Sequence, residues 1–396
     1  MFWVNVLHFY QPSWQTKKIV DKVVDEAYQP ILNILEKNPY IKITLNVSAS
    51  LVEHFNNFGY NHILNQIKFL AEKGQIEFLG SAKYHPILPL LPQKEAIRQI
   101  KLNEETCSKH FGKFWQPRPY GFFLPELAYN KKTAQIIDKL GYKYIILDEI
   151  SYNGKIGQDI FNNNWRIDKL NLLVIFRHRI LSNVFFDKDL RDEAKFWSVL
   201  KEDGRSKNIL ITAFDGENLG HHFKKRDEIW AKLLLNPKIK ILLGKESFSL
   251  FKKEKTVEPL SSSWSSTEEQ LQNNIPYGLW KHPENIIHQY QWQLTELALK
   301  AIKLGRGNSN FKSARRLLDE ALSSDGYWWA SANPWWNPHI VFRSVDLFLK
   351  IFTLLKKDLP VSYFNQAQTI KNKIDQEIDK CLKSGRCIMT KSIGEK

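Results

Sequence analysis

Acidic side chains follow several short apolar runs of this sequence. Glu126 comes directly after the run that ends at Pro125, and Asp215 ends a later run and precedes Gly216. Two carboxyl groups on opposite sides of a glycosidic bond are the usual apparatus of glycoside hydrolysis. One protonates the leaving oxygen, and the other acts as nucleophile or as base for water. Glu126 and Asp215 are therefore a candidate pair, and Gly216 would let the backbone turn sharply or approach a ligand.

Three further carboxylates are rivals by chemistry alone, namely Glu77, Glu149 and Glu217. Each also stands near the boundary of an apolar run, and spacing along the chain does not rank the five. The elements that must position these residues are therefore the next question.

Seven short apolar or β-branched runs predict strands. They are Phe2–Phe9, Ile41–Ser48, Gln75–Ser81, Pro119–Pro125, Tyr142–Asp148, Asn171–His178 and Asn208–Asp215. Amphipathic helical patterns lie between most of them, best at Lys17–Lys37, Leu51–Lys73, Gln93–Phe111 and Lys131–Leu140. This alternation is typical of a parallel sheet with crossover helices. Seven units within about 220 residues favour a closed or nearly closed barrel.

The carboxyl ends of these predicted strands carry most of the chemically useful side chains. Barrel enzymes hold their reacting groups at this end. The residues there are His8, Asn46, His85, Glu126, Asp148, Arg177, His178, Asp215 and Glu217. The strand bodies are mostly apolar, whereas solvated charges would be scattered over helix surfaces. We therefore expect an active site at this end of the barrel.

The character of the sequence changes after about residue 255. A Ser-rich stretch gives way to long helical patterns at Pro283–Leu304, Asn310–Leu322, Ser344–Lys357 and Asn365–Lys383. Their apolar faces need a partner. We predict a catalytic barrel over residues 1–255 and a helical domain over residues 256–396 that packs on the barrel and contributes to the active-site cleft. Eight of the 13 tryptophans lie at or beyond Trp230, and Ser384–Lys396 is expected to be a frayed tail.

Composition indicates an ordinary globular protein of 396 residues, 43% hydrophobic and 25% charged. The formal charge is +15, but the lysines are dispersed, which favours a solvated surface over nucleic-acid binding. The three cysteines, Cys107, Cys381 and Cys387, form no C-x-x-C, and neither a secretory signal nor a membrane span is evident. We expect a cytoplasmic protein without nucleic-acid or membrane partners. Its oligomeric state is open.

Several motifs in this order resemble glycoside hydrolase family 57. Leu7–Pro12 is similar to the first family region, which centres on His-Gln-Pro. The later matches are Gly74–Glu77 with Tyr84–Pro86, then Leu124–Tyr129, Ala213–His221, and the Trp-containing segments Ser263–Trp264 and Ser324–Trp329. These matches extend from residue 8 to about residue 330.

The resemblance implies an irregular (β/α)7 barrel with a C-terminal α-helical domain and no cofactor. It implies a retaining enzyme on α-glucans or oligosaccharides, α-amylase-like or 4-α-glucanotransferase-like, with Glu126 as nucleophile and Asp215 as general acid/base. A retaining pair is expected roughly 5–5.5 Å apart. The residues expected to bind substrate are His8, Glu77, His85, Glu217, His221, Trp264, Asp325 and Trp328.

Three positions depart from the family pattern and bear on specificity. Tyr10 stands where the first region usually has His, although His8 is two residues away. His178 and Asn183 replace aspartates of amylase-like members. Hydrolysis or transfer, and α-1,4, α-1,6 (branching) or α-galactoside specificity, therefore stay open.

Two hypotheses from other classes compete with this one. A metal-dependent polysaccharide deacetylase would use histidines and aspartates as ligands, here from among His8, His85, His178, His221, His222, Asp148 and Asp215. The chain has no tight H-x-H or H-x-x-x-H pair, so we predict no metal site. A non-catalytic glycan-binding relative is the third hypothesis, and the presence of both carboxylates argues against it.

Overall fold

The computed structural model describes residues 1–115, 118–205 and 208–384, in two compact units. The first unit combines Met1–Lys83 with Leu88–Trp264, and the second combines Tyr84–Ile87 with Ser265–Lys396. The boundary expected after residue 255 falls inside strand β10 (Glu254–Val257), which pairs with β6 (Asn164–Ile167). The expected frayed tail lies outside the described residues, apart from Ser384 at the end of the last helix.

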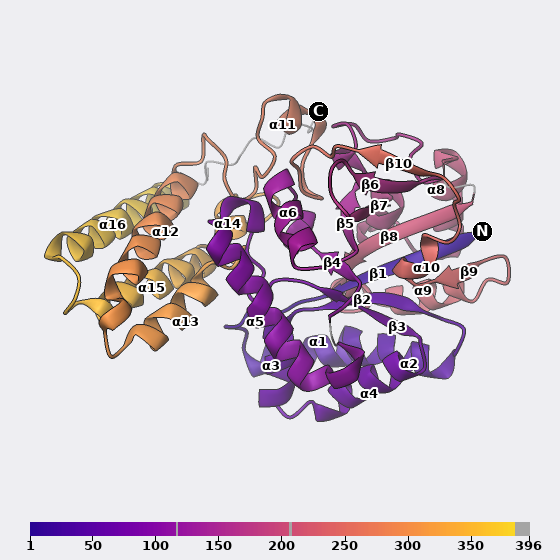
Figure 1. Cartoon of the computed structure of the whole chain (residues 1–396), viewed down its shortest axis with the longest axis horizontal. Helices are drawn as coiled ribbons and strands as arrows, with labels where there is room; N and C mark the ends of the chain where they lie inside the picture. Colours follow the sequence, from indigo (N-terminus) through magenta and orange to yellow (C-terminus); the bar gives the residue numbers. More distant parts are fainter. Residues whose placement is uncertain (116–117, 206–207, 385–396) are drawn as a thin grey trace. The chain divides into compact units, whose positions relative to one another are not determined.

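One mixed sheet organises the first unit, with ten strands among the residues described (Figure 1). The other strands are β1 (Phe2–Phe9), β2 (Ile43–Val47), β3 (Ile76–Gly80), β4 (Gly121–Phe123), β5 (Tyr144–Asp148), β7 (Leu173–Arg177), β8 (Ile209–Asp215) and β9 (Lys240–Leu242). Their order is β10-β6-β7-β5-β4-β3-β2-β1-β8, and β9 pairs with β1.

All seven predicted strands are confirmed, and they form the expected (β/α)7 barrel from β7 through β5, β4, β3, β2 and β1 to β8. Every pair within this series is parallel. The sequence missed β6, β9 and β10. Of these, β6 forms an antiparallel pair with β7.

Helices alternate with the strands of the first unit. They are α1 (Lys17–Val23), α2 (Gln29–Lys37), α3 (Ala49–Asn57), α4 (Asn61–Glu72), α5 (Gln93–Phe111), α6 (Lys131–Lys139), α7 (Arg179–Asn183), α8 (Glu193–Asp203), α9 (Arg226–Leu234) and α10 (Gly244–Ser247). A π-helical turn, η1 (Val24–Tyr28), separates α1 from α2. The pattern predicted from Leu51 to Lys73 is two helices, because the chain turns at Gly59 with φ +88°.

Strand pleating divides the apolar side chains of β1 between two cores. Trp3 and Leu7 belong to the outer core with residues of α1 to α4, which lie along one face of the sheet in Figure 1. Val4 and Val6 alternate with them and belong to the inner core, which includes Ala213 of β8. The alternation follows because successive side chains of a strand point to opposite faces.

The second unit is helical, as predicted. Its helices are α11 (Glu268–Gln272), α12 (Ile286–Leu304), α13 (Phe311–Ala321), α14 (Asp325–Ala330), α15 (Pro338–Leu355) and α16 (Val361–Ser384). Four of them match predicted patterns, and α15 starts earlier than predicted because Asn337 caps it by accepting a bond from His339 N at 3.1 Å. In the part of the chain that is described, no helix has the length and apolarity needed to cross a membrane.

Candidate active site

A layer of polar side chains closes the carboxyl end of the barrel. His8 of β1 lies level with Asn46 of β2 and with Asp215 of β8. Residues in register on neighbouring parallel strands point to the same face. The next inward residues below are Val6 and Ala213, which belong to the inner apolar core. Polar groups therefore face inward at the end of the barrel where active sites are found.

His8 is buried and held in one orientation. Its Nδ1 lies 2.6 Å from Asn46 Oδ1. Its ring stacks on Phe123 at 4.7 Å and meets the edge of Trp264 at 6.4 Å, measured between ring centroids. Burial lowers the pKa of His8 to about 4, against the opposing effect of the Asn46 hydrogen bond. The imidazole is therefore neutral near pH 7. A neutral imidazole is suited to hydrogen-bond a sugar hydroxyl rather than to act as a general acid.

Asp215 is half-buried at the end of β8. Burial raises the pKa of its carboxyl group, and the positive charge of Arg177 opposes this. Gly216, the next residue, is required by close packing, because a Cβ there would stand 2.3 Å from Cε1 of Phe9. A carboxyl group that keeps its proton to higher pH than an ordinary aspartate is suited to act as a general acid.

Glu217 is buried beside Asp215 and anchors the loop that follows β1. Its Oε1 accepts hydrogen bonds from the Tyr28 hydroxyl, from Tyr10 N at 3.3 Å and from Gln11 Nε2 at 3.3 Å. Burial raises the pKa of Glu217, and the nearby charge of Asp215 raises it further. Tyr10, the residue that departs from the family pattern, is thus fixed by its backbone, and its ring stacks on His8 at 5.8 Å.

Glu126 lies in a strained turn after β4. Its φ is 59° and that of Leu127 is 46°, in the left-handed region that non-glycine residues seldom occupy. Trp264 holds this turn at two points: Nε1 donates to Glu126 Oε2 at 2.8 Å, and its backbone N donates to Glu126 O at 3.1 Å. Strain of this kind persists only where the surroundings fix it, and it clusters at functional sites.

Arg177 joins this site from β7. Its guanidinium carbon lies 5.3 Å from the ring centroid of Trp264, and its Nε donates to Asp148 Oδ2 at 2.7 Å. Arg179 Nε donates to Asp148 Oδ1 at 2.8 Å. Asp148 is fully buried, and the guanidinium groups of Arg177 and Arg179 are its partners there.

Comparison with known proteins decides the family. The profile of Glycosyl hydrolase family 57 matches residues 3–258. The chain belongs to this family. An alpha-amylase from Pyrococcus horikoshii is 23% identical over 84% of this chain and 57% of its own length. A 1,4-alpha-glucan branching enzyme from Thermococcus kodakarensis is 43% identical, but over 29% of this chain and 17% of its own length.

A solved family 57 structure has the same fold. The crystal structure of a branching enzyme from Thermococcus kodakaraensis matches with a TM-score of 0.68 and 15% identity, over 95% of both chains. This chain spans little more than half the length of the curated amylase. The resemblance drawn from the motifs and the predicted barrel with a helical C-terminal part are confirmed.

Two of the rival carboxylates of this family 57 chain have structural partners elsewhere. Glu77 lies level with Thr44, below the polar layer, and accepts from Tyr144 Oη at 2.9 Å and Lys245 N at 3.0 Å. Glu149 is fully buried and accepts from Arg179 N at 2.8 Å, and from the guanidinium of Arg205. Glu77 therefore lies below the polar layer, and Glu149 is held by Arg179 and Arg205.

Other residues expected to bind substrate lie in two places. His221 Nδ1 lies 2.7 Å from Glu26 Oε2 in η1, beside Lys224. In the second unit, His85 Nδ1 lies 3.0 Å from Ser324 Oγ, next to Asp325 at the start of α14.

Trp328 of the same helix belongs to an aromatic cluster of the second unit. It packs edge-on against Trp329 at 4.9 Å and Trp335 at 6.0 Å between ring centroids. Trp335 is 60% exposed, so part of this cluster faces solvent. The second unit therefore holds His85, Asp325 and Trp328 near one another.

The residues described contain no group of three or more His, Cys, Asp or Glu side chains placed to hold a metal ion. His178, a candidate ligand, has its Nε2 2.8 Å from Asp203 Oδ2 and stacks on Phe161. Asn183, which also departs from the family pattern, accepts a hydrogen bond from Arg177 Nη2 at 2.9 Å. Sequence reasoning saw Arg177 as a strand-end residue but missed its contacts with Trp264 and β8.

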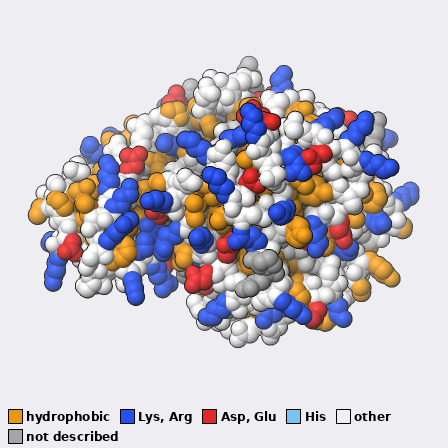
Figure 2. Space-filling model, in the orientation of Figure 1, with side chains coloured by type: hydrophobic (Ala, Val, Ile, Leu, Met, Phe, Trp, Pro, Cys, Tyr) orange, Lys and Arg blue, Asp and Glu red, His pale blue; other side chains and the backbone are white. Residues whose placement is uncertain are grey.

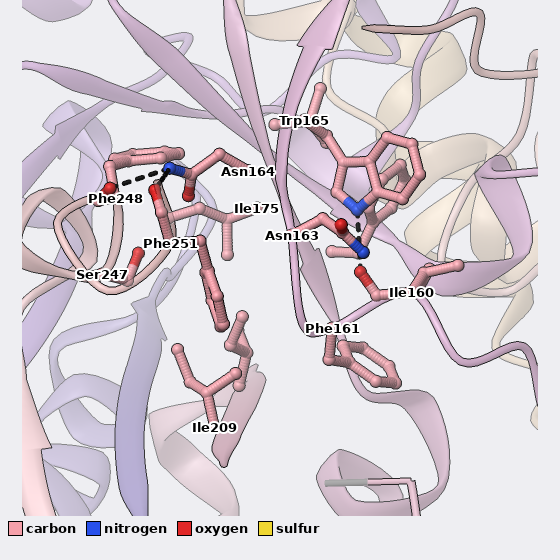
Figure 3. Close-up of a pocket in the computed structure, with 13 residues that line it drawn as sticks. Ile160, Phe161, Asn163, Asn164, Trp165, Ile175, Ile209, Ser247, Phe248 and Phe251 are labelled. Atoms are coloured by element: carbon pink, nitrogen blue, oxygen red, sulfur yellow. Dashed lines mark hydrogen bonds between the residues drawn. The ribbon is translucent and has the colours of Figure 1, made fainter. Parts of the chain in front are cut away.

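A small cavity near the amino ends of β7 and β8 is not the substrate site (Figure 3). Trp165, Phe248, Phe251 and Ile209 are among its lining residues. Its volume of about 20 Å³ has room for about one water molecule. A sugar ring needs more space than this, so this cavity does not hold the substrate.

Proposed function

We propose that this chain is a retaining enzyme acting on α-glucans, with Glu126 as nucleophile and Asp215 as general acid/base. The observation that carries the proposal is the contrast between the two carboxylates. Glu126 receives a hydrogen bond from the indole N–H of Trp264, a group that only donates and so pairs with an accepting carboxylate oxygen. Asp215 has a pKa raised by burial. Environments that separate two carboxylates in this way mark an acid and its partner.

The proposed reaction has two displacements. Glu126 attacks the anomeric carbon while the bond to the leaving oxygen breaks, and Asp215 gives its proton to that oxygen. Asp215 then takes a proton from water or from a sugar hydroxyl. That oxygen attacks the anomeric carbon and releases Glu126.

The surrounding residues take roles that their contacts support. His8, kept neutral by burial, would hydrogen-bond a sugar hydroxyl. Trp264 would act mainly on Glu126, because its N–H and its backbone both bond to that residue. Glu217 would hold Tyr10 and Gln11 in place through hydrogen bonds. The charge of Asp215 raises the pKa of Glu217, so the ionisation of the two groups is linked.

In the helical unit, we propose Asp325 and Trp328 as sugar contacts, with His85 holding Ser324 beside them. The exposed aromatic cluster supports this, because aromatic faces stack on the apolar faces of sugar rings. Glu77 and His221 are better explained as structural residues, since each has close partners outside the polar layer.

The basic surface does not point to another class of ligand. Lys and Arg side chains are scattered among other types on the face drawn in Figure 2. The motifs, the family and the carboxylate pair all concern sugar chemistry, so the net charge of +15 is assigned to solvation.

Product analysis tests the proposal. The protein is incubated with maltoheptaose, amylose, glycogen and an α-galactoside, and the products are sized and debranched. Shorter glucans alone indicate hydrolysis, longer and shorter glucans together indicate 4-α-transfer, and new α-1,6 branches indicate branching. Each outcome supports action on α-glucans. Reaction of the α-galactoside alone, or of no substrate at all, contradicts it.

A further inference from the structure

The barrel closes between β7 and β8 without strand pairing. Within the described residues no ladder joins these two strands: β8 pairs with β1 on its other edge, and β7 pairs with β5 on one edge and, at Leu173 and Val174, with β6 on the other. The segment Arg177–Asn183 bonds to the open edge of β8 instead. His178 N donates to Ile211 O at 2.8 Å, and Ala213 N donates to Ser182 Oγ at 3.1 Å. Side chains and one turn thus take the place of a ladder.

Arg177 completes this seam. Its Nη1 donates to Ala213 O at 2.7 Å, so the N–H and the C=O of Ala213 both end on this segment. Ala213 stands two residues before Asp215 on β8. The position of the Asp215 backbone therefore depends on bonds made by Arg177 and Ser182.

The same guanidinium supports the other carboxylate. It lies over the ring of Trp264, at 5.3 Å from the centroid, and Trp264 Nε1 donates to Glu126 Oε2 at 2.8 Å. Three acceptors fix its plane: Asp148 Oδ2 and Ala213 O, which are buried, and Asn183 Oδ1, which belongs to an exposed residue. A planar fork bound at three points has little freedom to turn, which a lysine ammonium would not reproduce.

We propose that Arg177 is a positioning residue that holds Asp215, through Ala213, and Glu126, through Trp264, in the geometry that the reaction needs. It does so without touching the sugar. This inference rests on the proposed function for its kinetic consequences. It also gives Asn183 a role: the amide supplies the third acceptor for Arg177 without adding a negative charge beside Asp148.

Kinetics of Arg177→Lys and Arg177→Gln test the proposal. Lys keeps the charge and loses the fork, and Gln loses both. Both variants should lower kcat on maltoheptaose by on the order of 100-fold while KM changes by less than about threefold, because small displacements of reacting groups cost turnover rather than binding. Arg166→Gln is the matched control. Arg166 is bonded by two nitrogens to Glu254 on β10, outside the site, and its variant should keep wild-type kcat.

Titration of Asp215 gives a readout that needs no activity. Carboxyl-¹³C NMR of the aspartates, assigned with Asp215→Asn, follows its protonation in each variant. The charged or titratable groups around Asp215 are Arg177 from β7, Glu217 after β8, His8 from β1 and Tyr28 from η1. Arg177→Gln should raise the pKa of Asp215, whereas Arg177→Lys should leave it near that of the wild type.

Several results would overturn the inference. A wild-type kcat in Arg177→Lys would show that the planar guanidinium is not needed. A higher KM with unchanged kcat would show that Arg177 binds substrate instead. If the wild type acts on no glucan, the proposed function fails, and an unchanged Asp215 titration in Arg177→Gln then overturns the inference separately. If Arg177→Gln does not fold, Asn183→Ala carries the test. It removes one acceptor of the fork and should lower kcat about tenfold, and wild-type kcat there contradicts the proposal.

Discussion

Glu126 and Asp215 are the residues on which the proposed chemistry depends. Glu126→Gln and Asp215→Asn keep the shape of each side chain and remove its charge or its proton. Each should lower turnover of maltoheptaose by on the order of 10³-fold or more, because nucleophile and acid act as a unit. Activity assays with circular dichroism check this. Near-wild-type turnover in either folded variant removes that residue from the mechanism.

Asp215 should also make stability depend on pH. Its pKa is raised above the ordinary value of an aspartate, so the folded state holds the proton more tightly than the unfolded state. Below about pH 4 the group is protonated in both states and costs nothing. As pH rises through the raised pKa, a buried charge must form in the folded state, and stability falls.

Asp215→Asn removes that cost. We expect it to be more stable than the wild type above the raised pKa and equal to it near about pH 4. Urea unfolding at two pH values measures the difference, and Asp168→Asn, at a loop aspartate of the same unit, is the control. An equal or lower stability of Asp215→Asn at high pH would show that burial does not penalise this carboxylate.

The sequence alone identified some of the candidate site residues but not the contacts that position them. Chemistry alone left five candidate carboxylates near the boundaries of apolar runs, and the family motifs separated Glu126 and Asp215 from the others. Glu77 shows why placement was incomplete: β3 begins at Ile76, so Glu77 is its second residue and lies below the polar layer. Arg177 was visible as a strand-end residue, but its role depends on the unpaired seam between β7 and β8, which no local pattern encodes.

At the scale of elements, the seam between β7 and β8 is the feature most open to test. Ser182→Ala removes the acceptor of the buried Ala213 N–H, and a buried donor without a partner costs about 1–3 kcal/mol. Denaturant unfolding should show a loss of that order. Ser249→Ala is the control, because Ser249 is exposed and its hydroxyl donates to Glu246 O. A loss at Ser182 no larger than at Ser249 would mean that the seam is held by other contacts.

Strands and helices were predictable where the sequence shows a continuous apolar run or a consistent helical periodicity. The seven barrel strands are apolar because they are covered on both faces. Strand β10 reads Glu-Lys-Thr-Val with its first three residues exposed, so it lacks the apolar signal. Helix α14 begins Asp-Gly-Tyr-Trp and has six residues, too short for a period to be recognised.

At the scale of the whole molecule, the deacetylase hypothesis can be separated from the family 57 proposal. The histidines and aspartates that it needs have other partners: Asp148 lies between two arginines, His178 contacts Asp203, and His221 contacts Glu26. Activity on α-glucans should therefore survive dialysis against a chelator. A complete loss that zinc restores would favour the metal-dependent hypothesis instead.

The proposed mechanism requires a covalent intermediate on Glu126, which water or a sugar hydroxyl releases with Asp215 as base. The most direct measurement is mass spectrometry of the Asp215→Asn variant after reaction with a 5-fluoro-α-glucosyl fluoride, whose fluoride leaves without protonation. We expect one glucosyl adduct, located by peptide mapping on Glu126 and absent from the double variant with Glu126→Gln. An adduct on another carboxylate, or its persistence in the double variant, would contradict this mechanism.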